Sequence, residues 1–203
     1  MQPQTRKKRV LIADTTQETR RNTRVMLSSV KGVEVVAIAL DGTQAIEMAR
    51  QHKPDIVLLD INMSKVNGLN AYKQILKESP RTACILVSAE KHPETIQAAK
   101  ELGIQNFLIK PFTEHELDSA MVAVIQRLDS QNNSQRASML RALADEYVRT
   151  KRTDEEAVKA FEEAIELPNS ELVWMQTLAM IYVVRKRWAK LKVLAEKLEQ
   201  RTK

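Results

Sequence analysis

The chain has 203 residues, of which 43% are hydrophobic and 29% charged, a composition typical of a soluble globular protein with one or two domains. The single cysteine, Cys84, excludes an internal disulfide framework and is interpreted as a core residue in a reducing compartment. The N-terminus lacks the pattern of a signal peptide, and no apolar run approaches the ~18 residues of a membrane span. We therefore expect a cytoplasmic protein without a membrane role.

The net charge of +6 raises the question of nucleic-acid binding. Much of this charge comes from two short clusters, Arg6–Arg9 and Arg185–Arg187. Neither cluster is interleaved with aromatic residues, and the sequence has no zinc-finger spacing. A solvated basic surface is the favoured interpretation, so nucleic acid is not an expected partner, and a DNA-binding regulator is a minor alternative.

Up to about Leu128, the sequence alternates short apolar runs with amphipathic segments of helical period. Strands that are apolar on both faces and linked by helices are typical of βαβ units with a parallel sheet. Residues 8–128 therefore predict an α/β domain, a doubly wound (βα)5 arrangement with a parallel five-stranded sheet, preceded by a basic tail of residues 1–7. The expected strands are Val10–Ala13, Val33–Ala39, Ile56–Leu59, Cys84–Ser88 and Phe107–Ile109, and the expected helices are Glu18–Ser29, Thr43–Gln51, Leu69–Glu78, Pro93–Leu102 and Glu114–Arg127.

The polar stretch "DSQNNSQ", which begins at Asp129, predicts a linker over residues 129–136. Residues 137–203 carry only helical patterns, and these recur after about 34 residues, a period typical of two-helix hairpin repeats. Pro168 and Asn169 are expected to close the first hairpin. A plain amphipathic bundle with chance spacing is the alternative. The matching positions are Leu143, Ala144 and Tyr147 with Leu178, Ala179 and Tyr182, 35 residues later, and Ala157, Phe161 and Ala164 with Leu191, Ala195 and Leu198, 34 residues later.

Polar groups stand at the carboxyl ends of four of the expected strands: Asp14, Asp60, Ser88 and Lys110. Because the carboxyl ends of parallel strands share one edge of a sheet, we expect these groups to converge. Two carboxylates can hold Mg²⁺, a lysine can neutralise a transferring phosphoryl group, and Asp60 can act as a nucleophile. Ser88 can donate a hydrogen bond to a phosphoryl oxygen. Each group alone has a structural interpretation, such as a helix cap or a turn, but their coincidence favours a phosphoryl-transfer pocket.

Residues 8–128 resemble the receiver domain of response regulators, and the resemblance is carried by "VLIADTT", "PDIVLLDINMSKVNGL", "ILVSAE" and "NFLIKPF". It implies a flavodoxin-like (βα)5 fold in a bacterial two-component system, in which a sensor histidine kinase or a phosphotransfer protein phosphorylates Asp60. It also implies a Mg²⁺ site formed by Asp14, Asp60 and the backbone carbonyl of Asn62.

The same resemblance implies which residues respond to the phosphoryl group. Ser88 is the expected phosphate-sensing hydroxyl, and Phe107 is the aromatic residue that turns inward on activation. Lys110 is the amine that pairs with phosphate, and its peptide bond to Pro111 is expected to be cis.

Two residues depart from the family pattern. Most receivers have two adjacent acids after the first strand, whereas here Asp14 is followed by Thr15. The missing acid is normally the closer metal ligand, so Mg²⁺ binding and phosphoryl transfer are expected to weaken. Ser64 replaces the usual proline after the phosphoacceptor, a departure of minor consequence.

Residues 137–203 resemble tetratricopeptide repeats, through "LADEYVRTKRTDEEAVKAFEEAIELP" and "LAMIYVVRKRWAKLKVLAEKL". The resemblance implies a protein-binding surface on the concave side of stacked hairpins. Leu191 departs from it, because a small residue is usual at that position. Two hairpins are few for such a stack, so we expect either a fragment of a longer protein or an open end that a partner covers.

Two functions follow as hypotheses. In the first, phosphorylation of Asp60 controls protein–protein interactions of the helical repeats with a partner protein or a second copy of the chain, in a homodimer. In the second, Thr15 has ended phosphate cycling, and the chain is a constitutive scaffold. Neither hypothesis makes the chain an enzyme beyond its own phosphoryl transfer and dephosphorylation, since residues 137–203 carry no catalytic motif.

Overall fold

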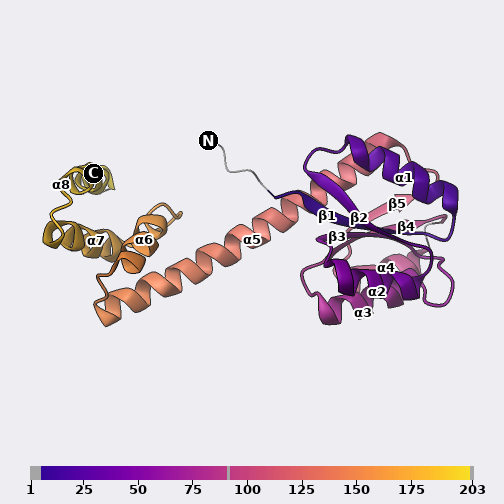
Figure 1. The fold of residues 1–203 in the computed structure, drawn as a ribbon, viewed down its shortest axis with the longest axis horizontal. Helices are drawn as coiled ribbons and strands as arrows, with labels where there is room; N and C mark the ends of the chain where they lie inside the picture. Colours follow the sequence, from indigo (N-terminus) through magenta and orange to yellow (C-terminus); the bar gives the residue numbers. More distant parts are fainter. Residues whose placement is uncertain (1–5, 91, 202–203) are drawn as a thin grey trace. The chain divides into compact units, whose positions relative to one another are not determined.

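The structure, a computed structural model, describes residues 6–90 and 92–201, so most of the expected basic tail lies outside the described residues. The chain divides into two compact units, Met1–Leu128 and Asp129–Lys203. The first unit alternates strands and helices (Figure 1). Its elements are β1 (Lys8–Ala13), α1 (Gln17–Ser29), β2 (Val33–Ala39), α2 (Gly42–His52), β3 (Ile56–Asp60), α3 (Gly68–Glu78), β4 (Ala83–Ser88), α4 (Pro93–Glu101), β5 (Asn106–Ile109) and the start of α5 (Glu114–Thr150).

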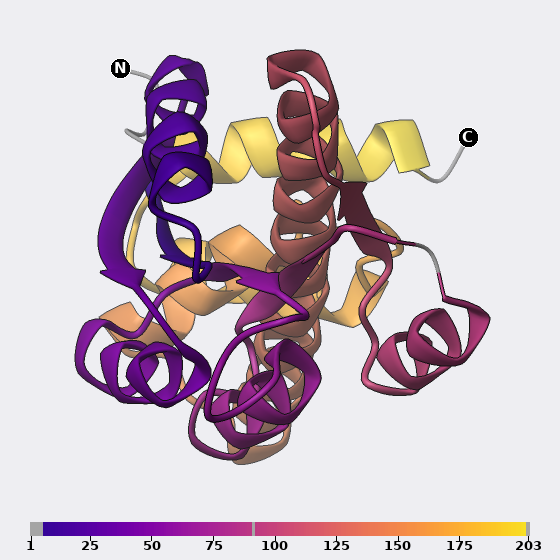
Figure 2. The ribbon, with the colours of Figure 1, turned by 90° about the vertical axis from the view of Figure 1, so that its right-hand side faces the viewer.

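The strands form one parallel sheet in the order β2-β1-β3-β4-β5. Helices α1 and α5 cover one face of this sheet, and α2, α3 and α4 cover the other (Figures 1 and 2). The prediction of a doubly wound parallel sheet is therefore confirmed. The strand order reverses between β1 and β3, and the carboxyl ends of strands at such a switch point border a crevice where ligands bind.

Each central strand is apolar on both faces because helices cover both faces of the sheet. Along β1, Leu11 and Ala13 belong to the core under α2 and α3, whereas Val10 and Ile12 belong to the core under α1 and α5. Cys84 is buried in the first of these cores, as predicted, and burial raises the pKa of its thiol. The central strands are therefore buried between two cores, one on each face of the sheet.

The second unit is all helical, as predicted, and its core joins all of its helices. Among the residues described, no helix has both the length and the apolar character needed to span a bilayer. Besides the C-terminal part of α5, the helices are α6 (Glu155–Ala164), α7 (Leu172–Val184) and α8 (Trp188–Arg201).

The sequence predicts a linker at residues 129–136, whereas in the structure α5 continues through this segment without interruption. The segment is polar because it is exposed, and it contains no glycine or proline. Serine, asparagine, glutamine and aspartate each cost roughly 0.7 kcal/mol or less in a helix interior, so polarity alone does not end a helix. The division between the two units still falls between Leu128 and Asp129.

The two helical hairpins repeat in conformation as well as in sequence. The first hairpin consists of α5 from residue 137 and α6, and the second consists of α7 and α8. Their turns contain Lys151 and Lys186, 35 residues apart, with φ angles of 53° and 54°. In both turns the next backbone N–H bonds back five residues, from Arg152 to Tyr147 and from Arg187 to Tyr182. The helical-hairpin prediction is thus consistent with the structure.

One of the matched positions differs between the hairpins. Phe161 is fully buried, but its expected counterpart Ala195 is exposed, and Leu194 occupies the buried position instead. The turn before α8 is shorter than the turn before α6, which moves the register of α8 by one residue. Asn169, in the loop that closes the first hairpin, adopts the left-handed conformation with φ of 56°.

Candidate functional site

Three of the four side chains predicted at the strand ends meet at one rim of the sheet. The Nζ atom of Lys110 lies 2.5 Å from Oδ2 of Asp14 and 2.8 Å from Oδ2 of Asp60. Both aspartates are almost completely buried, with exposed fractions of 3% and 4%. They come from the ends of β1 and β3, the adjacent strands at the switch point. One ammonium ion therefore bridges two buried carboxylates.

The other oxygen of each carboxylate accepts a backbone N–H from its own loop. Oδ1 of Asp14 accepts from the N–H of Thr16 at 2.7 Å, and Oδ1 of Asp60 accepts from the N–H of Asn62 at 3.1 Å. Such bonds are typical of aspartates where a strand passes into a turn. Each carboxylate thus has a fixed orientation, with Oδ2 directed to Lys110.

The charge of Lys110 is maintained by its partners. Burial alone would lower the pKa of this amine, but hydrogen bonds to Asp14 and Asp60 outweigh burial and raise its pKa above the usual value. Lys110 is therefore an ammonium at neutral pH. Its peptide bond to Pro111 is cis, as the sequence predicts.

Thr15, the residue in place of the second acid, is exposed next to Asp14. Arg20 of α1 donates from Nη1 to the backbone oxygens of Asp14 and Thr15, at 2.7 and 2.8 Å. This arginine holds the β1–α1 loop and was not predicted from the sequence. The only signal for it is a long cation one turn into the helix that follows the loop.

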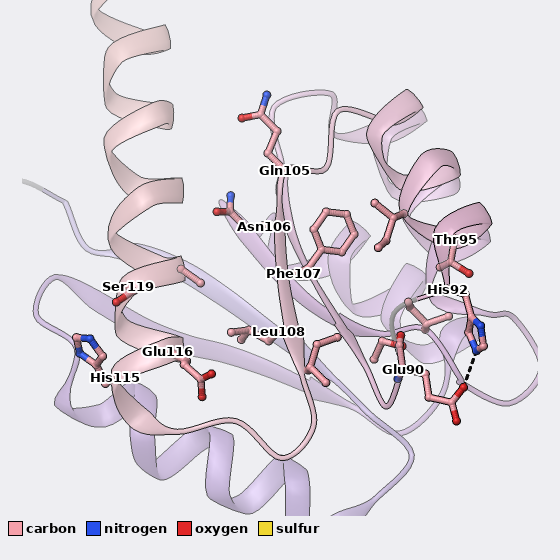
Figure 3. A pocket seen from close by; sticks show the side chains of 15 residues that line it. Glu90, His92, Thr95, Gln105, Asn106, Phe107, Leu108, His115, Glu116 and Ser119 are labelled. Carbon is pink, nitrogen blue, oxygen red and sulfur yellow. Dashed lines mark hydrogen bonds and ion pairs between the residues drawn. The ribbon is translucent and has the colours of Figure 1, made fainter.

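Ser88 and Phe107 take no part in the ion pairs that join Lys110 to the two carboxylates. The Ser88 hydroxyl donates to the backbone oxygen of Glu90 at 2.6 Å and accepts from the N–H of Glu90 at 3.1 Å. Phe107 lines a groove of about 740 Å³ bordered by α4, β5 and α5, and its ring is directed toward α4 (Figure 3). Two histidines, His92 and His115, lie on the walls of the same groove.

The loop between β3 and α3, which carries Asn62, is clamped by the start of α2. The carboxylate of Asp41 caps α2 at Gln44 and also pairs with Nζ of Lys65 at 2.7 Å. Gly42 approaches the loop so closely that a Cβ atom there would lie 1.8 Å from the backbone oxygen of Val66. This contact was not predicted from the sequence, where its only signal is the Asp-Gly pair after β2.

Comparisons with known proteins agree with this geometry. A family model described as "Response regulator receiver domain" matches residues 10–122. The chain is 34% identical to the chemotaxis protein CheY of Thermotoga maritima over 114 residues, which covers 56% of the chain and 94% of that protein. It is 35% identical to the transcriptional regulatory protein PdtaR of Mycobacterium tuberculosis over 121 residues, 59% of the chain, and spans only 58% of the length of that relative.

Solved structures give the same result. The receiver domain of AraT, a response regulator from Geobacillus stearothermophilus, matches with a TM-score of 0.57 and 27% identity, covering 62% of the chain and 98% of that domain. The response regulator domain of Thermotoga maritima CheB matches with a TM-score of 0.54 and 31% identity, covering 61% of the chain and 98% of that domain. With more than half of its residues matched by the family model, the chain belongs to the response-regulator receiver family.

Proposed function

We propose that the chain is a bacterial, cytoplasmic response regulator whose receiver accepts a phosphoryl group on Asp60 from a sensor histidine kinase or a phosphotransfer protein. The observation that carries this proposal is the buried pair Asp14 and Asp60 bridged by Lys110 at the switch-point edge of the sheet. An oxygen of Asp60 attacks phosphorus, the bond from phosphorus to the donor nitrogen breaks, and the donor imidazole takes the electron pair. Lys110 neutralises charge on the phosphoryl oxygens.

The residues at this edge fit Mg²⁺, the cation that receivers of this family use. Two buried carboxylates already converge on one cationic group, and Mg²⁺ prefers oxygen ligands from one or two carboxylates plus waters. Asp14, Asp60 and the backbone carbonyl of Asn62 would hold the ion, which when bound supplies positive charge to the phosphoryl oxygens. Because Thr15 is neutral, we propose that this site binds Mg²⁺ more weakly than a site with three acids. Among the described residues, no three acidic, histidine or cysteine side chains gather in one place.

The proposed switch follows from the position of Ser88. To donate a hydrogen bond to a phosphoryl oxygen on Asp60, its hydroxyl must leave the backbone oxygen of Glu90. That exchange moves the β4–α4 loop, which borders the groove containing Phe107. Phosphorylation would thereby alter the surface formed by α4, β5 and α5 and, through it, the interactions of the helical repeats with a partner protein or a second copy.

The second candidate is a receiver that acts as a constitutive interaction scaffold without phosphate cycling. Thr15 in the place of an acid is the specific observation in its favour. Receiver domains are in general signalling modules, and both candidates assign the chain a role in signalling or protein interaction rather than an enzymatic output.

The two candidates are separated by the rate of phosphorylation with acetyl phosphate and Mg²⁺, followed by intact-protein mass spectrometry. The first predicts a slow but complete adduct in the wild type and faster reaction of Thr15→Asp, because an added negative charge tightens Mg²⁺ binding by about tenfold, or ~1.4 kcal/mol. Calorimetric titration with Mg²⁺ alone measures that affinity. If the phosphoryl adduct forms in Thr15→Asp but not in the wild type, the second candidate, a constitutive scaffold, is supported.

A further inference from the structure

The second unit leaves a large apolar surface uncovered. Helix α7 is apolar around most of its circumference, although only one side is buried: Trp174 and Tyr182 fill the core, whereas Met180 and Val184 are 71% and 79% exposed. A helix that is hydrophobic all round is ordinarily buried. Of the eleven large hydrophobic side chains exposed in the described residues, seven fall within Leu172–Val193. Exposed apolar side chains that are this concentrated indicate an interaction surface, whereas single exposed hydrophobic residues scattered over a protein do not.

The exposed side of α7 faces away from the first hairpin. The Tyr182 hydroxyl donates to Glu162 of α6 at 2.6 Å, and Met180, two residues earlier, lies on the opposite side of the helix. The repeat supports the same placement. In the first hairpin Asp145 accepts the Trp174 indole N–H at 2.7 Å, and its counterpart 35 residues later is Met180. Met180 thus lies on the side of the second hairpin that faces away from the first.

The start of α8 extends the same surface. Lys190 and Lys197 pair with Glu162 and Glu166, so that side of α8 faces the first hairpin. Trp188 precedes Lys197 by nine residues, two and a half helical turns, and therefore lies on the opposite side. It is 59% exposed. We use the name end face for the surface made by Met180, Val183, Val184, Trp188, Lys192, Ala195 and Glu196.

The end face carries a basic and an acidic residue, so its charges are complementary to those of the same surface on a second copy. Lys192 and Glu196 are exposed and follow Trp188 at intervals of four residues, so all three lie along one side of α8. If two α8 helices pack antiparallel with their crossing point at the level of residue 194, next to the small Ala195, each Lys192 lies opposite Glu196 of the other copy. The contact between the two hairpins is different, because its ion pairs join acidic residues of α6 and the turn after it, Glu155, Glu162 and Glu166, to basic residues of the second hairpin.

We propose that the end face binds the end face of a second copy, forming a twofold-symmetric homodimer. A twofold interface requires one surface to be complementary to itself, and a balanced pair of charges around an apolar centre has that property. Trp188 and Met180 are also residue types enriched in protein interfaces. The proposal specifies the homodimer named under the proposed function, but it does not depend on phosphorylation of Asp60.

The test is analytical ultracentrifugation of the full chain without a phosphodonor. The wild type is expected to dimerise at micromolar concentration, and Met180→Glu and Trp188→Glu are each expected to be monomeric. Because both residues are exposed, the variants should keep the wild-type circular dichroism spectrum. Met139→Glu is the matched control: Met139 is 74% exposed on the first hairpin, and its substitution should leave the dimer intact.

Charge reversal tests the symmetry directly. Lys192→Glu and Glu196→Lys should each weaken dimerisation by roughly tenfold, since each places like charges opposite one another twice, and the double variant should restore it. A wild type that stays monomeric overturns the proposal, as does a dimer unaffected by Met180→Glu and Trp188→Glu. Asp60→Asn should dimerise like the wild type, which separates this result from any failure of the proposed phosphorylation.

Discussion

Lys110 joins two buried carboxylates, and its removal would leave two negative charges side by side. Its pKa is raised on folding, so its contribution to stability is complete below the ordinary value of 10.5 and is lost as pH rises through the higher folded value. We predict that Lys110→Met is destabilised relative to the wild type at pH 7 and less so at about pH 11, where the wild type begins to lose the contribution of this amine. Urea unfolding at both pH values measures this. Equal destabilisation at both would contradict it, and Lys100→Met, at an exposed site, is the control.

Gly68 packs against the backbone of Asp60, the proposed phosphoacceptor, since a Cβ atom at Gly68 would lie 2.4 Å from the backbone oxygen of Asp60. We predict that Gly68→Ala displaces Asp60 and slows phosphorylation by at least about tenfold, a barrier increase of ~1.4 kcal/mol. The control is Gly32→Ala, which strains a residue with φ of 77° far from the site and costs about 1–2 kcal/mol of stability. Equal phosphorylation rates in the two variants would refute the role of Gly68.

The sequence predicts Asp14, Asp60, Ser88 and Lys110 together because each stands at the carboxyl end of a buried strand, and these ends share one edge of a parallel sheet. Arg20 and the pair Asp41 and Lys65 escape prediction because their partners are backbone oxygens or side chains brought close only by the fold. The direction of the Ser88 hydroxyl likewise depends on the backbone of its own loop. Contacts made by loops depend on tertiary packing, and the hydrophobic periodicity of the sequence does not predict them.

Among the elements, α5 differs most from expectation. Its N-terminal part packs on the sheet through Leu117, Met121 and Val124, and its C-terminal part contributes Ala144 and Tyr147 to the second core. Residues 129–136, between these two parts, are exposed and polar, and a polar stretch of this kind has the same composition as a linker. The strand positions could be predicted because a short apolar run bounded by turn residues is seldom anything other than a buried strand. An exposed stretch of helix has no apolar face, so its sequence carries no helical period.

The continuity of α5 is testable by hydrogen exchange. If residues 129–136 are helical, each of their amides is hydrogen-bonded within the helix. These amides should then exchange at least about tenfold more slowly than the amides of an unstructured chain, which corresponds to a free energy of opening of ~1.4 kcal/mol or more. Mass spectrometry of peptides that cover this segment gives the rates. Replacing Asn133 with proline should remove the protection against exchange. If the wild type shows no protection in this segment, residues 129–136 form a linker and not a helix.

In the whole molecule, two units have separate hydrophobic cores. Both tryptophans, Trp174 and Trp188, lie in the second unit, so tryptophan fluorescence reports the unfolding of that unit. We predict that Leu86→Ala, at a fully buried site of β4, destabilises the receiver by roughly 2–5 kcal/mol. The transition seen by circular dichroism should shift, while the fluorescence transition stays in place. A shared shift would show that the units unfold as one.

We propose that Asp60 is the phosphoacceptor of a receiver that still functions with Thr15. The most direct test is peptide mass spectrometry of the full chain after reaction with acetyl phosphate and Mg²⁺. We predict an increase of about 80 Da, one added HPO₃ group, on the peptide that contains Asp60, lost in Asp60→Asn and when the metal is chelated. No adduct on this peptide, or an adduct that persists in Asp60→Asn, would contradict the claim.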